Sequence, residues 1–190
     1  MKNKSQPTRD YDYNSLKSVG RDVFINAHSD LRRPNLAVIG NHVAIDWGFV
    51  CTTQLIMGDR IHVGPHVSVI GGTRAILECH GYNNIMAGAR IICGSDRFDG
   101  SGLPGTMTPA HLRGQEIIRP VVIERFANVG TNAIVLPGSR LRQGVLVSAG
   151  SLIMGDTEPW GVYKGNPAVL VKKIVPDLIL QAAESLEKIT

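Results

Sequence analysis

Apolar side chains recur every six residues along most of this chain. Residues 57–72 read MGDRIHVGPHVSVIGG, and the repeated positions there are Met57, Val63 and Val69, the first two followed directly by glycine. An amphipathic helix repeats at roughly 3.6 residues and a strand alternates at every second residue, so neither explains the spacing. A fixed six-residue repeat instead predicts a parallel β-helix, in which each short strand and its turn form one wall of a triangular coil.

The repeat marks fifteen hexapeptides, with two breaks between them. Isoleucine, valine and leucine at these positions suit a pleated wall buried from inside, and the glycines suit corners with positive φ. Three hexapeptides make one coil, and coils stack at the strand spacing of about 4.8 Å, so about five coils give a prism on the order of 25 Å long. The marked positions are Ile39, Ile45, Cys51, Met57, Val63, Val69, Cys79, Ile85, Ile91, Ile123, Val129, Val135, Leu141, Val147 and Ile153.

The segments outside the repeat define the domain organisation. We expect an N-terminal arm over residues 1–20, the β-helix over 21–174 and a helix over 175–190. Residues 94–120, rich in Gly and Pro, interrupt the prism and must loop out, and a long excursion inside a strict solenoid is usually functional. The C-terminal segment has apolar residues at helical spacing behind Pro176, which predicts a helix packed on, or capping, the end of the prism.

Composition places this single domain in a reducing compartment. The chain has 190 residues, 43% of them hydrophobic, and only three cysteines, with no paired framework. Cys51 and Cys79 fall on interior positions and read as small buried apolar groups. The polar N-terminus shows neither a signal peptide nor a membrane anchor, so we expect a soluble cytoplasmic protein without a membrane partner.

The formal net charge of +4 allows an acidic partner. The basic residues are dispersed, however, and no basic stripe is interleaved with exposed aromatic residues. This pattern argues against a nucleic-acid partner and favours a phosphorylated small molecule.

Several stretches resemble the left-handed β-helix acyltransferases of the hexapeptide superfamily. They are VGPHVSVIGG, SDRFDGSGL, the run from VVIERFANVG to SAGSLI, and EPWGVYKGNPAVLVKKI, so the resemblance covers about residues 16–174. It is nearest to the maltose and galactoside acetyltransferases and to the sugar acetyltransferases of surface-polysaccharide pathways, including lipopolysaccharide biosynthesis. It implies a left-handed coil, which general crossover rules would not predict. It also implies a homotrimer, acetyl-CoA as donor, and an active site in each groove between subunits.

The resemblance also implies which residues hold the donor. The pantetheine arm would lie along Asn132, Ala133, Ala149 and Gly150. Trp160 would meet the adenine or the adjacent subunit. The lysines expected at the CoA phosphates are Lys164, Lys172 and Lys173, and each is equally readable as a solvated surface charge.

The base is harder to assign among six histidines. His62 lies between Ile61 and Val63 on the flank of a strand, where similar sugar acetyltransferases carry a histidine, and a neutral imidazole suits a general base. The competing interpretation is a structural histidine. In the galactoside and xenobiotic branches the catalytic histidine opens the excursion, at the place of Asp96 here. Asp96 could instead orient His62 or bind the acceptor's ammonium group, and Asp99 is a weaker candidate for substrate binding.

These residues predict an acetyl-CoA-dependent acetyltransferase that acts on a sugar. An amino acceptor needs less help from a base than an alcohol, so a nucleotide-linked amino sugar is favoured, with sugar O-acetylation as the alternative. We expect direct attack on the thioester, because Cys93 has no histidine beside it in sequence to activate it as a nucleophile. We expect no metal.

Two other classes share the repeat. A γ-carbonic-anhydrase-like enzyme binds zinc through three histidines, and His62, His66 and His80 invite that comparison. The first two are four residues apart rather than five, and His66 sits at a turn. A non-catalytic trimeric scaffold is the other alternative, but it would not need the excursion.

Overall fold

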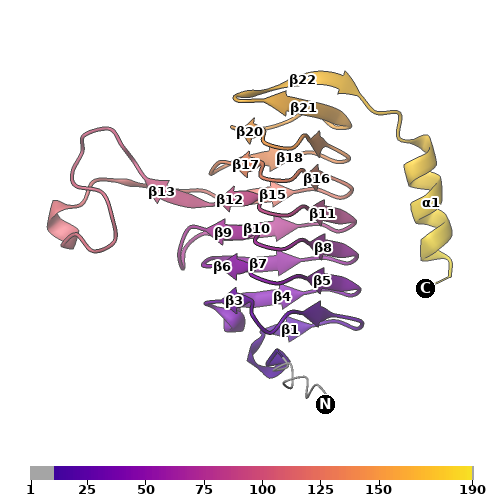
Figure 1. Ribbon diagram of the computed structural model, residues 1–190, viewed down its shortest axis with the longest axis horizontal. Helices are drawn as coiled ribbons and strands as arrows, with labels where there is room; N and C mark the ends of the chain where they lie inside the picture. Colours follow the sequence, from indigo (N-terminus) through magenta and orange to yellow (C-terminus); the bar gives the residue numbers. More distant parts are fainter. Residues whose placement is uncertain (1–10, 190) are drawn as a thin grey trace, which may run out of the picture.

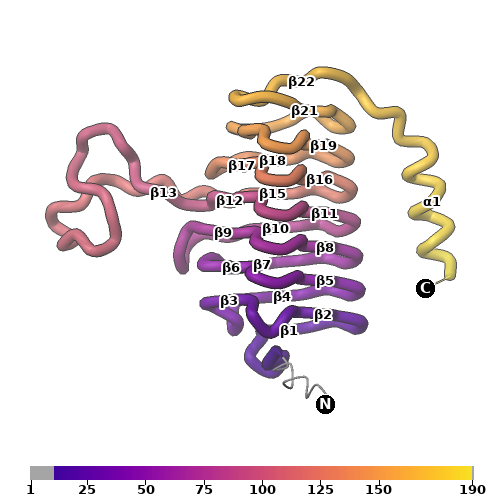
Figure 2. The backbone as a smooth tube through the Cα atoms, in the orientation of Figure 1, coloured from indigo at the N-terminus to yellow at the C-terminus, as the bar shows by residue number. Residues whose placement is uncertain are grey.

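The computed structural model describes residues 11–189, and its main body is a stack of triangular coils (Figure 1; Figure 2). Each coil contributes one short strand to each of three sheets, and equivalent strands of successive coils pair in parallel. The predicted left-handed parallel β-helix is therefore confirmed. None of the helices within the described residues is long and apolar enough to cross a membrane.

Three sheets form the walls of the prism, here named A, B and C in the order in which the chain visits them. Sheet A contains β1 (Ser18–Val19), β4 (Ala37–Ile39), β7 (Gln54–Met57), β10 (Ile76–Cys79), β15 (Val121–Ile123) and β18 (Arg140–Leu141). Sheet B contains β2 (Phe24–Ile25), β5 (Val43–Ile45), β8 (Ile61–Val63), β11 (Asn83–Ile85), β16 (Asn128–Val129), β19 (Leu146–Val147), β21 (Gly161–Gly165) and β22 (Ala168–Lys173). Sheet C contains β3 (Asp30–Leu31), β6 (Val50–Cys51), β9 (Ser68–Ile70), β12 (Arg90–Ile92), β17 (Ile134–Val135) and β20 (Leu152–Ile153). We number the coils 1 to 6, from β1–β3 to β18–β20.

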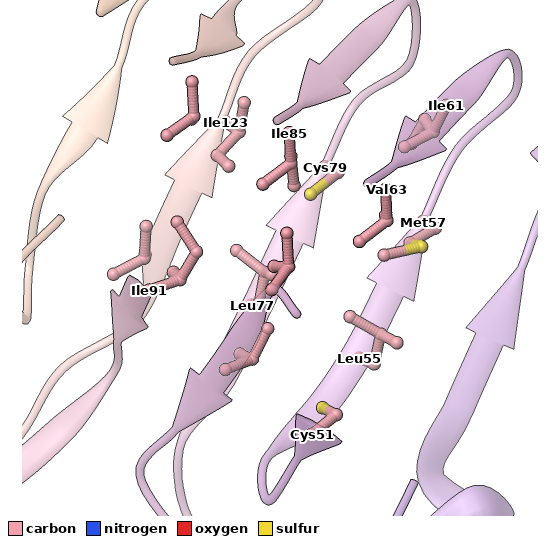
Figure 3. Packing of buried hydrophobic residues seen from close by; sticks show 14 of the residues in the cluster. Cys51, Leu55, Met57, Ile61, Val63, Leu77, Cys79, Ile85, Ile91 and Ile123 are labelled. Carbon is pink, nitrogen blue, oxygen red and sulfur yellow. The ribbon is translucent and has the colours of Figure 1, made fainter. Parts of the chain in front are cut away.

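The repeated apolar residues form the core, as the sequence predicts. All fifteen are at most 3% exposed. Met57 lies between Ile39 and Cys79 in the register of sheet A, which shows how one residue of each coil stacks on the next. Figure 3 shows part of this core, in which side chains that include Cys51, Met57 and Cys79 fill the space between the walls. Burial of each large aliphatic side chain contributes about 1.5–3 kcal/mol.

One coil precedes the first that the repeat marks. Val19, Ile25 and Leu31 keep the six-residue spacing, and their strands pair with β4, β5 and β6. The count is lost after Leu31 because the short 3-10 helix η2 (Pro34–Leu36) adds residues before Ile39. The prism therefore has six three-stranded coils rather than about five. Of the arm expected over residues 1–20, residues 1–10 lie outside the described residues, η1 spans Tyr13–Ser15 and β1 already belongs to sheet A.

The excursion leaves the stack after β12. Its stem is the antiparallel pair β13 (Gly94–Asp96) and β14 (Glu116–Ile118), and its far part contains the 3-10 helix η3 (Ala110–Leu112). Figure 1 shows it projecting from the prism on the side opposite to α1 (Asp177–Glu187). The excursion predicted over residues 94–120 thus carries its own hairpin.

The C-terminal helix α1 lies beside the stack, next to sheet B (Figure 1; Figure 2). The expectation that it packs on, or caps, the end of the prism is wrong. The end is closed instead by β22, which pairs antiparallel with β21, and the chain then turns back along the wall. Glu187 fixes the helix there, because its carboxylate pairs with Arg125 and accepts a hydrogen bond of 3.1 Å from the Tyr82 hydroxyl.

Candidate active site

The corner between sheets B and C brings together residues from every coil. We call it the B/C corner; it comprises residues 26–29, 46–49, 64–67, 86–89, 130–133 and 148–151. Backbone hydrogen bonds join the corners of successive coils, with the third residue of one corner donating to the second residue of the corner before it, as from His66 N to Trp47 O at 3.0 Å and from Gly88 N to Pro65 O at 2.9 Å. The corner is therefore a straight column in which each position repeats once per coil.

His62 lies beside this corner and is oriented by a carboxylate. It projects outward from β8, between the buried Ile61 and Val63. Its Nε2 lies 3.0 Å from Oδ2 of Asp46, the first corner residue of the preceding coil. In the neutral ring, an Nε2–H that donates to Asp46 leaves the lone pair on Nδ1. A histidine held by a carboxylate in this way can take a proton from a nucleophile.

A cavity of about 630 Å³ opens on the other side of His62, between sheet B and α1. Its walls are mostly apolar, and α1 contributes two alanines, an isoleucine and a leucine to them. Among the described residues, His42 Nε2 is a buried polar atom without a hydrogen-bond partner, while its Nδ1 lies 3.3 Å from Asp22. The lining residues are His42, Ala44, Arg60, Ile61, His62, Tyr82, Asn83, Asn84, Phe126, Asn128, Ile179, Ala182, Ala183 and Leu186.

The structure does not bring Asp96 to His62 within one chain. Asp96 ends β13 in the stem of the excursion, whereas His62 is on sheet B (Figure 1). Oδ2 of Asp96 accepts a hydrogen bond of 2.9 Å from Gly105 N. Asp99 lies farther out and pairs with Arg97 Nε at 2.8 Å. Hydrogen bonds from Ser101 lower the pKa of Asp99, so that it is ionised at neutral pH.

Four predicted donor-binding residues do come together. Asn132 and Ala133 occupy the B/C corner of coil 5, and Ala149 and Gly150 occupy it in coil 6. The Ala133 side chain is fully buried in the core, so it presents only backbone to a ligand. A Cβ added at Gly150 would meet no atom within 4 Å, which leaves open space beside the corner.

The remaining predicted donor-binding residues lie elsewhere. Trp160 is at the corner between sheets A and B, where its ring stacks on Phe126 at 6.0 Å. Lys164 is on β21, and Lys172 and Lys173 are on β22. Lys173 Nζ lies 2.7 Å from Glu158, so its charge is already paired.

None of the three cysteines is placed to act as a nucleophile. Cys51, Cys79 and Cys93 are all buried and unpaired. Burial raises the pKa of Cys93 to about 12 and also raises those of Cys51 and Cys79. A thiol with so high a pKa supplies almost no thiolate at neutral pH.

The three histidines that suggest a zinc site occupy different places. His62 is on sheet B, the His66 ring packs against Trp47 at 4.6 Å, and His80 lies 3.7 Å from Glu78 of sheet A. Within residues 11–189 no group of three or more His, Cys, Asp or Glu side chains is arranged to hold a metal ion.

The sequence did not single out Asp46 as the partner of His62. The two residues are sixteen positions apart, close to the eighteen of one coil, so the signal was a carboxylate one coil before the candidate histidine. Recognising it required the exact register of the corner.

The chain matches no protein-family model. It is 27% identical over 156 residues to the dTDP-4-amino-4,6-dideoxy-D-glucose acyltransferase of Escherichia coli, an alignment that covers 80% of each chain. It is 25% identical over 137 residues, 69% of each chain, to a probable macrolide acetyltransferase of Lysinibacillus sphaericus.

Solved structures share the fold. A variant of AntD, an N-acyltransferase from Bacillus cereus in complex with dTDP-4-amino-4,6-dideoxyglucose and coenzyme A, superposes with a TM-score of 0.86 at 24% identity, covering 92% of both chains. The hexapeptide-repeat acetyltransferase VCA0836 from Vibrio cholerae, in complex with acetyl coenzyme A, gives a TM-score of 0.56 at 17% identity over 85% of this chain and 73% of that one. Together with the six-residue repeat and the stacked coils, these similarities show that the chain has the fold of the hexapeptide-repeat acyltransferases and is similar in sequence to acyltransferases over most of its length.

Proposed function

We propose that this protein transfers an acyl group from acyl-CoA to the amino group of a nucleotide-linked sugar. The observation that carries the proposal is the similarity over four fifths of the chain to an acyltransferase of a dTDP-linked amino sugar. The fold match to an N-acyltransferase structure that contains such a sugar and coenzyme A supports it. Acetyl-CoA is the donor we favour. We place the reaction in the cytoplasm, as a step in making surface polysaccharides.

The chemistry needs little from the protein beyond positioning and one proton acceptor. The sugar amine attacks the thioester carbonyl, the C–N bond forms and the C–S bond breaks, and coenzyme A leaves as the thiol after it takes up the proton that the amine loses. An amine with a pKa near 8 is partly neutral at working pH, so a base has only to remove one proton as the bond forms. We assign this proton to His62 Nδ1, with Asp46 holding the ring at 3.0 Å. The buried cysteines favour direct transfer over an acyl-enzyme intermediate.

We place the donor along the B/C corner of coils 5 and 6. Asn132, Ala149 and Gly150 line this part of the column, and the space beside Gly150 is open. A pantetheine arm is long and narrow, so a track of small side chains with accessible backbone fits it. Lys164 and Lys172, on the hairpin that closes the same end, are the lysines we assign to the CoA phosphates.

We further propose a homotrimer whose active sites lie between subunits. Asp96 and His62 belong to opposite sides of one prism, so they can share a substrate only if the excursion reaches a neighbouring subunit (Figure 1). In that arrangement Asp96 binds the ammonium form of the acceptor beside the neighbour's His62, and Asp99, farther out on the excursion, contributes to the same pocket.

Subunit complementation tests this arrangement. His62→Ala and Asp96→Asn proteins are prepared separately, then unfolded and refolded together. Mixed trimers contain some sites with both native residues, so activity should return above that of either variant refolded alone. Activity that stays at the level of the separate variants would place both residues in one subunit and contradict the proposal.

The reaction itself is tested by thiol release from acetyl-CoA with a panel of acceptors. We expect turnover with dTDP-4-amino-4,6-dideoxyglucose and none with the corresponding sugar that carries a hydroxyl at the same carbon. The second candidate is O-acetylation, favoured by the similarity to a probable macrolide acetyltransferase. Turnover with hydroxyl acceptors, and none with amino sugars, would establish it instead.

A further inference from the structure

A tryptophan occupies a corner position that the fold fills elsewhere with small side chains. Trp47 is the second residue of the B/C corner in coil 2. The side chain is 50% exposed, so it adds little to the core. The coil does not require a large aromatic residue at this position, which suggests a role in binding. The equivalent residues of the other coils are Ala27, Pro65, Ala87, Thr131 and Ala149.

Two histidines hold the indole in place. The ring of His66 lies 4.6 Å from that of Trp47 at 86°, and the ring of His28 lies 6.4 Å away at 64°. Because the His66 ring is nearly perpendicular to the indole, the two are not stacked face to face. Gly48 makes room for this packing, since a Cβ there would come within 2.9 Å of His66 Nδ1. We call His28, Trp47 and His66 the Trp47 platform.

An arginine lies farther along the same edge. Arg90 begins β12 in coil 4, and its Nη1 donates hydrogen bonds of 2.8 Å to the carbonyls of His66 and Gly88. These bonds use two of its five N–H donors and fix the guanidinium beside the corner. Two coils separate Arg90 from Trp47, about 10 Å at the spacing of parallel strands. That separation is comparable with the length of a nucleoside diphosphate.

The acidic side chains next to the platform are already paired. Asp46 lies at the His62 ring, and Asp30 lies 3.1 Å from Arg32 Nε. The Arg90 guanidinium and the exposed Trp47 ring, which lie along this edge, favour an anionic ligand with an aromatic group.

We propose that the Trp47 platform binds the nucleobase of the acceptor, with the diphosphate held at Arg90. This inference rests on the proposed function and assigns the acceptor to coils 2 to 4 of the corner, next to the donor track in coils 5 and 6. The two substrates then lie along one corner of the prism and meet beside His62 of coil 3, where the proposed trimer brings Asp96 of a neighbouring subunit. Stacking on an exposed aromatic side chain depends little on which nucleobase is bound. The platform therefore supplies affinity, and the rest of the site selects the sugar.

Binding of dTDP is measured by tryptophan fluorescence. The chain has two tryptophans, so Trp160→Phe leaves Trp47 as the only one and Trp47→Phe leaves Trp160. We expect dTDP to quench the fluorescence of the Trp160→Phe protein in a saturable way and to leave that of the Trp47→Phe protein nearly unchanged. Saturable quenching of Trp160 alone would overturn the platform.

Kinetics of Trp47→Ala separate this inference from the proposed function. We expect KM for the dTDP-linked amino sugar to rise about tenfold, the effect of losing one base–aromatic stack, while KM for acetyl-CoA stays constant. Phe24→Ala is the matched control, because Phe24 is an equally exposed aromatic residue (52%) that projects from sheet B. Normal KM in a folded Trp47→Ala protein would overturn the platform and leave the reaction standing. Quenching of Trp47 by dTDP in a protein that acylates no amino sugar would keep the platform and overturn the reaction.

Discussion

Replacement of His62 by alanine should remove the proton acceptor without disturbing the fold. The His62 side chain is 51% exposed and its ring makes one hydrogen bond, to Asp46, so the variant should unfold at nearly the wild-type temperature. General-base catalysis contributes about 10²–10⁴-fold to a rate. An amine acceptor is already partly neutral, so we expect a fall in kcat near the lower end, about 100-fold.

Replacement of Asp46 by asparagine tests how the ring is held. A hydrogen bond to a charged group contributes about 1.5–3 kcal/mol, which corresponds to about 10–150-fold in rate if all of it serves orientation. The asparagine carbonyl still accepts from Nε2–H, so we expect a fall in kcat of about tenfold, smaller than that of His62→Ala.

The assay is thiol release at saturating amino sugar with varied acetyl-CoA. KM for acetyl-CoA should be unchanged in both variants, because the proposed donor residues in coils 5 and 6 are not touched. His80→Ala is the control, since His80 is also an exposed histidine near a carboxylate, 3.7 Å from Glu78, but follows a strand of sheet A. A kcat of His62→Ala within twofold of the wild type, or an equal fall in His80→Ala, would refute the assignment.

The corners and the core give three further predictions. Burial raises the pKa of Glu124, but hydrogen bonds from Arg140 and from the Gln143 amide lower it more, so it lies below the ordinary 4.5. Its ionised form therefore stabilises the fold above about pH 4.5 and loses this effect as the pH falls through the lower folded value. In thermal unfolding at neutral pH, Glu124→Gln should lower the free energy of unfolding by about 1.5–3 kcal/mol, and the difference from the wild type should become smaller in acid. A difference that does not change with pH would contradict this. Gly144 and Gly150 have φ of 69° and 68°, but a Cβ at Gly144 would overlap the Trp160 ring and one at Gly150 would meet nothing within 4 Å. Gly150→Ala should cost about 1–2 kcal/mol of unfolding free energy and Gly144→Ala about 1–3 kcal/mol more, and equal costs would contradict the packing. The thiols of the native protein should react slowly with an aromatic disulfide reagent because they are buried. Rapid stoichiometric labelling of Cys93 would instead support a mechanism with a covalent acyl-enzyme intermediate.

The six-residue repeat was sufficient to predict the walls of the prism, because each interior position needs only an aliphatic side chain and each corner needs a turn. It failed where the chain inserts extra residues within a coil. The first coil was missed because η2 moves Ile39 eight positions after Leu31 instead of six. The apolar face of α1 could be recognised from the spacing of its residues in the sequence. Which wall it covers depends on how the chain turns after β22.

The candidate site was predictable only in part, because it is built from neighbours in space. The outward position of His62 followed from its place between two interior residues. Its contact with Asp46 and the packing of His66 on Trp47 depend on how the side chains of successive coils meet at the corner, which the six-residue repeat of interior positions does not specify. The separation of Asp96 from His62 depends on which corner the excursion leaves, and no local pattern encodes that.

The most direct test of the account is the identity of the product. The protein is incubated with acetyl-CoA and dTDP-4-amino-4,6-dideoxyglucose, and the nucleotide sugar is recovered for mass spectrometry and NMR. The account predicts one added acetyl group, joined as an amide to the sugar nitrogen, with one free thiol released per product. An ester on a hydroxyl, or recovery of unchanged amino sugar while hydroxyl acceptors are consumed, would contradict it.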